Sequence, residues 1–94
     1  MNFIFEWDEN KAEINKRKHG VSFDEAQTVF VDNLSLMKAD TEHSDIEERL
    51  LIIGISNKNR VIVVSYTERC DKIRLISARK ATRNEQRQYE EDYL

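Results

Sequence analysis

The sequence has no proline, two glycines and one cysteine among its 94 residues. The single cysteine, Cys70, excludes an internal disulfide and is typical of a protein that folds in a reducing cytoplasm. With so few glycines, a glycine-rich phosphate-binding loop is also excluded. No stretch has the composition of a linker or a repeat. We therefore expect a single domain over residues 1–94 with a modest hydrophobic core.

Long hydrophobic runs are missing as well. The longest is LLIIGI, residues 50–55, whereas a helix that crosses a membrane needs about 20 mostly apolar residues. The first ten residues, MNFIFEWDEN, contain neither the basic segment nor the apolar stretch of a signal peptide. These absences predict a cytoplasmic protein with no membrane segment.

Metal ligands are scarce. One cysteine and two distant histidines, His19 and His43, cannot supply the four ligands of a usual zinc site. The acidic stretch DTEHSDIEE, residues 40–48, is a conceivable carboxylate metal site, but its composition is more typical of an exposed hairpin loop. We therefore expect no metal and no cofactor.

The net charge of −3 conceals a strong separation of charge along the chain. Residues 69–87 carry seven cations and two anions, and residues 11–18 carry four cations and one anion. Residues 40–48 carry five acids and no Lys or Arg. Such runs are often only solvated faces, but a local basic surface also attracts polyanions whatever the sum of the charges is.

Three helices are predicted from capping residues. Asp8 can cap a helix whose last turn is basic and which ends at Gly20. Ser22 opens a second helix with SFDE, and Thr82 opens a third with TRNE. Both patterns are capping boxes, in which an acid three residues after the cap completes the motif.

Five stretches have the composition of strands: NFIFEW, NLSLMKA, RLLIIGIS, RVIVVSYT and KIRLISA. The third and fourth are apolar on both faces, as expected of central strands that are covered from both sides. Short connections between the last three favour hairpins. The predicted order is β-α-α-β-β-β-β-α, an α+β domain with an antiparallel sheet, two N-terminal helices and one C-terminal helix.

One core is expected between the helices and the sheet. Tyr89 and Tyr93, four residues apart, are the expected anchors of the last helix. The residues predicted to form the core are Phe23, Val29, Phe30, Ile53, Val63 and Leu75.

Two motifs, KHGVSF and RLISARKAT followed by a glutamate and a tyrosine, occur in the order and spacing of a known family. Together with FEWDENKAEINKRKHGVSFDEAQTVFVD, EERLLIIG and YTER, they make the chain resemble the BrnT family of bacterial type II toxins over nearly its whole length. The resemblance implies a RelE-like ribonuclease that cleaves cellular RNA and blocks translation. It also implies a partner antitoxin, BrnA, that neutralises the toxin and supplies operator DNA binding to the complex.

Metal-free RNA cleavage requires a base for the ribose 2′-OH, cations for the phosphorane and an acid for the leaving oxygen. The candidates for phosphate and transition-state binding are Arg69, Arg74 and Arg79, although each could be only a surface arginine at a strand end. His19 can serve as acid or base because histidine changes charge near neutral pH. It could equally be a cation that favours the end of the first helix.

Other residues could assist the reaction or bind RNA. Glu85 could act as a base, but its capping role already explains it. Arg74 and Arg79 lie five residues apart, so they share a face only if the strand bulges or Arg79 lies in the turn. The residues predicted to contact RNA through phosphates or stacking are Trp7, Lys11, Lys18, Lys80 and Arg83.

Two other functions would explain the same basic surface. The first is a nucleic-acid-binding or corepressor module that leaves RNA intact. The second is an interaction domain whose basic face holds an acidic protein partner. Neither would be toxic through RNA cleavage, so expression of the chain alone separates both from a ribonuclease.

Overall fold

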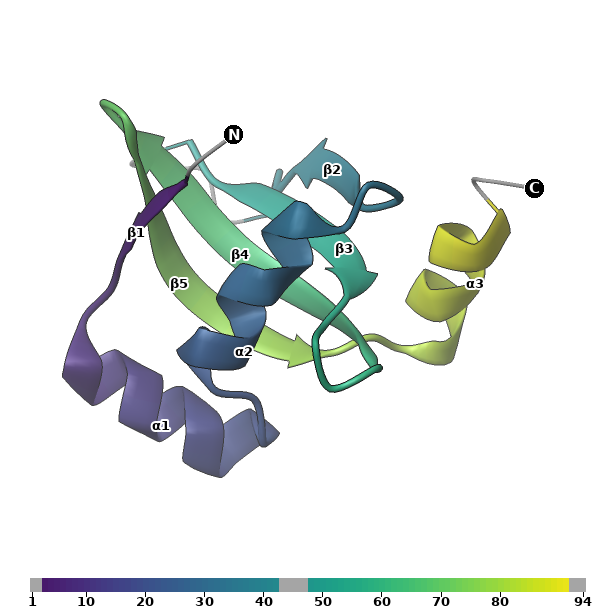
Figure 1. The fold of residues 1–94 in the computed structure, drawn as a ribbon, viewed down its shortest axis with the longest axis horizontal. Coiled ribbons are helices and arrows are strands. Elements are labelled where there is room, and N and C mark those ends of the chain that lie inside the picture. The colour runs from purple at the N-terminus through teal and green to yellow at the C-terminus, as the bar shows by residue number, and fades with distance from the viewer. Residues whose placement is uncertain (1–2, 43–47, 92–94) are drawn as a thin grey trace.

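The structure, a computed structural model, describes residues 3–42 and 48–91. The predicted order β-α-α-β-β-β-β-α is confirmed (Figure 1), with a short 3-10 helix, η1, following the second helix. Of the expected features, Tyr93 and most of the acidic stretch after Glu42 lie outside the described residues. The elements are β1 (Ile4–Glu6), α1 (Glu9–His19), α2 (Phe23–Gln27), η1 (Thr28–Val31), β2 (Leu36–Ala39), β3 (Leu50–Ile55), β4 (Val61–Arg69), β5 (Lys72–Lys80) and α3 (Arg83–Glu91).

The five strands form one sheet in the order β1-β5-β4-β3-β2. The strands from β2 to β5 pair antiparallel, as predicted, and the apolar strands β3 and β4 lie inside the sheet. The exception is β1, which pairs parallel with β5. Because two helices and the other strands separate β1 from β5 in the sequence, no hairpin fixes the direction of β1.

The predicted caps are present. Asp8 accepts hydrogen bonds from two backbone N–H groups at the start of α1, and Gly20 ends that helix with a φ of 71°. Ser22 accepts a hydrogen bond from the backbone N–H of Glu25, but the Glu25 carboxylate does not return to it. It instead accepts hydrogen bonds from Arg60 Nε at 2.7 Å and Nη2 at 2.6 Å, which tie α2 to the turn between β3 and β4.

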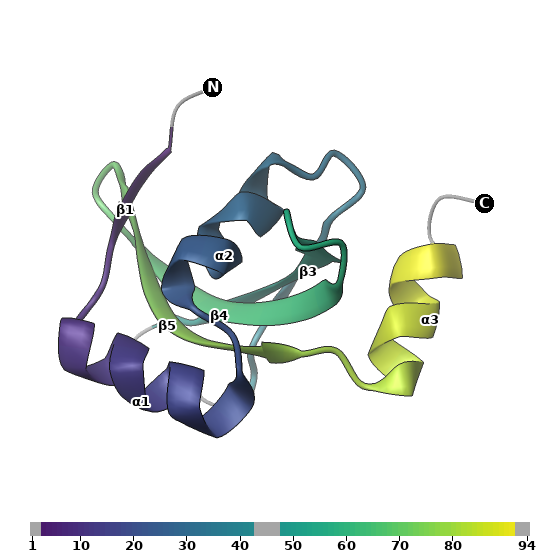
Figure 2. The ribbon, with the colours of Figure 1, turned by 60° about the horizontal axis from the view of Figure 1, so that its bottom comes forward.

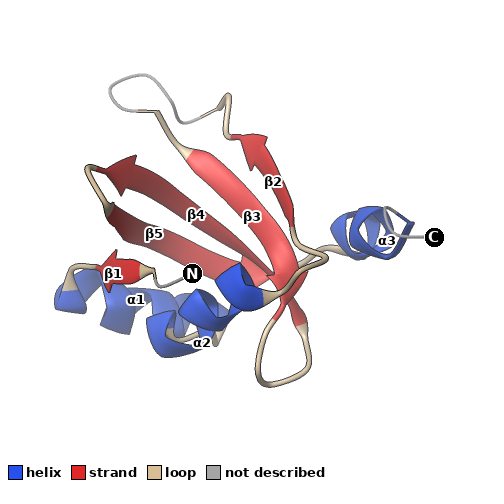
Figure 3. Cartoon of the chain, turned by 45° about the horizontal axis from the view of Figure 1, so that its top comes forward, coloured by secondary structure: helices blue, strands red, loops and turns tan. Residues whose placement is uncertain are grey.

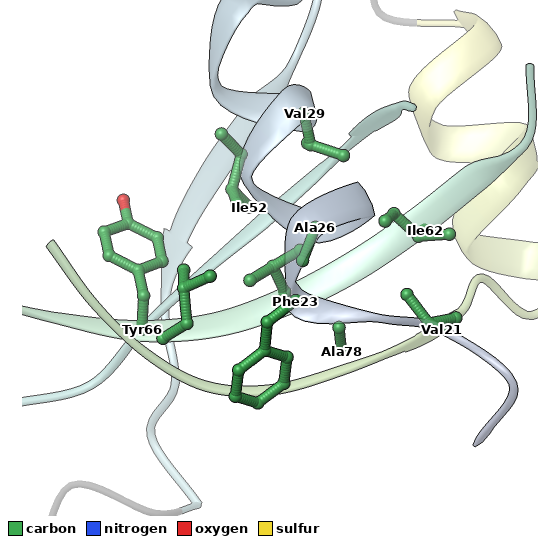
Figure 4. Packing of buried hydrophobic residues seen from close by; sticks show 10 residues of the cluster. Val21, Phe23, Ala26, Val29, Ile52, Ile62, Tyr66 and Ala78 are labelled. Atoms are coloured by element: carbon green, nitrogen blue, oxygen red, sulfur yellow. The ribbon is translucent and has the colours of Figure 1, made fainter. Parts of the chain in front are cut away.

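The largest hydrophobic cluster lies between one face of the sheet and the helices α1, α2 and η1 (Figures 3 and 4). Phe23, Val29 and Leu75 are buried in it, and Phe30 packs against it. Its other buried members are Val21, Ala26, Ile52, Ile62, Val64, Tyr66 and Ala78.

A second cluster corrects the expectation of one core. Ile53 and Val63 are buried, but they pack with Tyr89 of α3 and not with the first cluster. Alternate residues of a strand point to opposite faces, so Ile53 faces away from Ile52. Figures 1 and 2 show α3 at the opposite end of the molecule from α1 and β1. No helix within residues 3–42 and 48–91 is long and apolar enough to cross a membrane.

Candidate active site

A β-bulge sets which side chains β5 presents on the face of the second cluster. Ser65 of β4 pairs with Ser77, whereas the next residue, Tyr66, pairs with Leu75, so Ile76 is an extra residue in β5. Further along, Arg74 lies opposite Thr67 of β4, and Arg79 lies opposite Val63. The bulge therefore places both arginines on one face of the sheet. It is one of the two arrangements that the sequence analysis required for them to share a face.

A pocket of about 500 Å³ opens on this face, between β2, the strands β3 to β5 and the start of α3. Ser65 and Ser77 are directly paired neighbours in its floor. Its charged lining is balanced, with the cations Lys38, Arg49 and Arg79 and the acids Asp40, Glu42 and Glu85.

Arg79 and Glu85 form a charged pair in the pocket. Arg79 donates two hydrogen bonds to the carboxylate, from Nη1 at 2.7 Å and from Nη2 at 2.9 Å. This two-pronged arrangement is the one by which arginine also binds phosphate. The Arg79 side chain keeps 39% of its surface exposed, so solvent and ligands reach it.

The start of α3 fixes the position of the carboxylate. Thr82 accepts a hydrogen bond from the backbone N–H of Glu85 at 3.1 Å, and Glu85 Oε1 accepts one from the backbone N–H of Thr82 at 2.9 Å. These two bonds complete the capping box that the sequence predicts. Glu85 thus stabilises the helix end and holds Arg79 at the same time.

The pair strongly favours the charged form of both side chains. The hydrogen bonds from Arg79 lower the pKa of Glu85 to about 2, against the raising effect of burial. The same bonds raise the pKa of Arg79. At neutral pH the pocket therefore contains a fixed guanidinium and a fixed carboxylate in contact.

Arg74 and Arg69 share the face of Arg79 but lie outside the pocket. Arg74 is four residues along the sheet from Arg79, about 13 Å at the usual rise of a strand, and lies 3.6 Å from a carboxylate oxygen of Glu6. Arg69 is about 20 Å from Arg79 by the same measure and is exposed. The three arginines form a row along the sheet and do not converge on one phosphate.

His19 is separated from this row. It lies in the last turn of α1, and α1 packs along β5 from the side of the first cluster. Asn15 of the same helix bonds both backbone groups of Ala78, which fixes α1 at the edge of β5. His19 is not part of the pocket lining.

The predicted RNA contacts also divide between the two sides. Trp7 packs edge-on against Phe23, with ring centres 5.9 Å apart, and donates a hydrogen bond to Glu9. Trp7 is half-buried, Lys11 and Lys18 are exposed on α1, and none of the three lines the pocket. Lys80 and Arg83 are exposed at the junction of β5 and α3, next to Arg79 in sequence but outside the lining.

The polar pocket residues that had not been considered as site candidates include Lys38, Arg49, Ser65 and Ser77. The serines gave no usable signal, because each lies in a strand that contains several other polar residues. Lys38 and Arg49 gave none either, since only the pairing of β2 with β3 brings them to the pocket. Within the described part of the chain, no group of three or more His, Cys, Asp or Glu side chains could hold a metal ion.

Comparison with known proteins identifies the family of the chain. The family model described as "Ribonuclease toxin, BrnT, of type II toxin-antitoxin system" matches residues 7–85, a span that includes both Arg79 and Glu85. The chain belongs to the BrnT family. The resemblance drawn from the motifs is confirmed, and the family name gives RNA as the target and an antitoxin as the partner.

A solved BrnT structure has the same fold. The ribonuclease toxin BrnT of Brucella abortus superposes with a TM-score of 0.64 and 26% sequence identity. The match covers 87% of this chain and 100% of the Brucella chain. No curated protein sequence matches the chain. The mixed α+β architecture is therefore that of a BrnT toxin.

Proposed function

We propose that this BrnT-family protein cleaves RNA without a metal ion, with the pocket around Arg79 as its active site. The observation that carries the proposal is the guanidinium of Arg79, which Glu85 holds in a two-pronged hydrogen bond at the pocket surface. A guanidinium that is kept at the pocket surface can bind the non-bridging oxygens of a phosphate and stabilise the charge that develops on them.

The row of arginines suits an extended substrate. With the reacting phosphate at Arg79, a strand of RNA that follows β5 would pass Arg74 and then Arg69. These two side chains are then contacts to phosphates further along the strand, which add affinity without base specificity. His19, on the other side of β5, has no role at the reacting phosphate in this proposal.

Cleavage of cellular RNA would inhibit translation, and the antitoxin would stop it by covering the pocket. An acidic side chain of a BrnA-like antitoxin can engage the cations Lys38, Arg49 and Arg79, which line one pocket. DNA binding by the complex would then reside in the antitoxin. Lys11 and Lys18 on α1 are available for a second contact with RNA or partner.

The test is induced expression of the chain alone in bacteria. We expect growth arrest and new RNA ends, and we expect co-expression of the neighbouring antitoxin gene to restore growth and to yield a complex on purification. Harmless expression with intact RNA would favour a non-catalytic nucleic-acid-binding module. Rescue of growth without a physical complex would contradict direct neutralisation.

A further inference from the structure

We infer that Glu85 is a catalytic residue of this pocket: the substrate phosphate takes over the Arg79 fork, and the released carboxylate oxygen accepts the proton of the attacking 2′-OH. This inference rests on the proposed function and adds to it the base that metal-free cleavage needs.

The two oxygens of Glu85 have different hydrogen-bond partners. Oε1 accepts from the backbone N–H of Thr82 at 2.9 Å as well as from Arg79 at 2.7 Å. Oε2 accepts a hydrogen bond from Arg79 at 2.9 Å. If Arg79 turns to another anion, the capping bond still holds the carboxylate at the start of α3, and Oε2 becomes able to accept a proton.

A phosphate is the kind of anion that can make Arg79 turn. Carboxylates and phosphates both present two oxygens to the parallel N–H groups of a guanidinium, so they compete for the same fork. In the free protein, Glu85 occupies the place that the phosphate oxygens would take. Because Arg79 and Glu85 line one pocket, the exchange requires only a rotation of an arginine side chain that is 39% exposed.

The exchange also changes the strength of the base. Hydrogen bonds from Arg79 are the largest cause that holds the pKa of Glu85 at about 2, and burial acts in the opposite direction. When Arg79 leaves Glu85 to bind the substrate phosphate, the pKa of Glu85 therefore rises. The other charged groups of the pocket are Lys38, Arg49, Asp40 and Glu42, which are two cations and two acids.

The chemical step is an in-line displacement at phosphorus. The 2′-OH proton moves to Oε2 of Glu85, the 2′-oxygen forms a bond to phosphorus, and the bond from phosphorus to the 5′-oxygen breaks. The 5′-oxygen takes a proton from solvent, and Glu85 later returns its proton to solvent. The products are a 2′,3′-cyclic phosphate and a 5′-hydroxyl, and no oxidation or reduction occurs.

The experiment uses Glu85→Gln in the purified full chain. Glutamine also completes a capping box, so the fold should persist, but its neutral amide cannot serve as a base or hold both arms of the fork. We expect kcat for RNA cleavage to fall by about 10²–10⁴-fold. A 2′-O-methyl RNA lacks the attacking hydroxyl and so measures binding alone. We expect it to bind Glu85→Gln more tightly than the wild type, because the competing carboxylate is gone.

Glu91→Gln is the matched control, because Glu91 is an exposed acid of the same helix outside the pocket. It removes the same charge, so Glu85→Gln must tighten binding more than Glu91→Gln does. Weaker RNA binding by Glu85→Gln would show that Glu85 only positions Arg79. A higher kcat would show that it only blocks the fork. Either result overturns the inference.

Two further measurements separate this inference from the proposed function. Glu85→Asp keeps a carboxylate one methylene shorter, and we expect it to lose kcat without losing RNA affinity, which tests the idea even if Glu85→Gln is poorly folded. Wild-type cleavage that survives in Arg79→Ala would refute the proposed function itself. Cleavage that depends on Arg79 but not on Glu85 would refute only the base.

Discussion

Arg79 is the candidate transition-state donor of the pocket, since Glu85 keeps its guanidinium at the pocket in the free protein and its side chain is reachable from solvent. Arg79→Ala should therefore abolish toxicity, because loss of one preorganised donor costs about 10²–10³ in rate. Arg79→Lys should restore toxicity only in part, since an ammonium group cannot form the fork. Growth after induction measures both.

The matched control is Arg17→Ala, which removes one positive charge from the exposed surface of α1. It should remain toxic. If Arg17→Ala and Arg79→Ala were equally harmless, total charge and not the fork would explain toxicity. Circular dichroism of both purified variants verifies that each is folded.

Gly54 is required by close packing under η1. A Cβ at this position would lie 2.8 Å from Val29 Cγ1 and 3.0 Å from Asp32 Oδ2. Gly54→Ala should lower the free energy of unfolding by about 1–3 kcal/mol, as expected for overpacking. Urea denaturation measures the change.

Gly20 offers a contrasting substitution. No atom lies within 4 Å of a Cβ built there, but its φ of 71° is unfavourable for other residues. Gly20→Ala should therefore lower the free energy of unfolding by about 1–2 kcal/mol through backbone strain alone.

For Gly54→Ala, the opposite outcome is a stability equal to that of the wild type. That result would show that η1 is not closely packed against β3 at this position.

At the scale of elements, α3 is attached to the sheet through Tyr89. Its side chain is buried with Ile53 and Val63, and its hydroxyl donates a hydrogen bond to Asp32 Oδ2 at 2.6 Å. Tyr89→Phe should lower the free energy of unfolding by about 1.5–3 kcal/mol, the range for hydrogen bonds to charged groups. Tyr89→Ala should cost more, about 3–5 kcal/mol, because it also leaves a cavity.

Thermal or urea unfolding of the two variants measures both effects. The order of the losses is the critical result. If Tyr89→Phe were as stable as the wild type, the bond to Asp32 would contribute nothing to the stability of the fold.

Element order could be predicted from the sequence because each start signal is local. Asp8, Ser22 and Thr82 cap the helices within three residues of themselves. The parallel pairing of β1 and the second cluster could not be predicted, because both depend on contacts between distant segments. The bulge at Ile76 also depends on the pairing of two strands. The sequence indicated only that Arg74 and Arg79 share a face if the strand bulges or if Arg79 lies in the turn.

At the scale of the whole molecule, stability should fall in acid. The folded protein holds the pKa of Glu85 at about 2, against 4.5 for an unperturbed glutamate, and the pKa values of Glu25 and Asp32 are also lowered. The unfolded chain therefore binds more protons as pH drops. The stabilisation from Glu85 is complete above about pH 4.5 and is lost as pH falls toward 2.

Urea denaturation across this range tests the assignment. We expect Glu85→Gln to unfold with a shallower dependence on pH than the wild type. The other two carboxylates leave part of the dependence in place. An unchanged slope in Glu85→Gln would contradict the strong pairing of Glu85 with Arg79.

The site was predicted only in part, for a physical reason. Arg79 could be found because it lies in a basic strand-to-helix junction, and Glu85 was recognised only as a cap. The pocket itself depends on the register of four strands, which brings Lys38 and Arg49 to Arg79. His19, which was proposed from its residue type, lies in the last turn of α1 and is not among the residues that line the pocket.

In the proposed mechanism, protein side chains around Arg79 cleave RNA without a metal ion. The most direct measurement is cleavage of RNA by the purified toxin in excess EDTA, with identification of the new ends. We predict continued cleavage, ends that carry a 2′,3′-cyclic or 3′-phosphate, and no cleavage by Arg79→Ala. Complete inhibition by EDTA that magnesium reverses would rule out metal-free cleavage at Arg79.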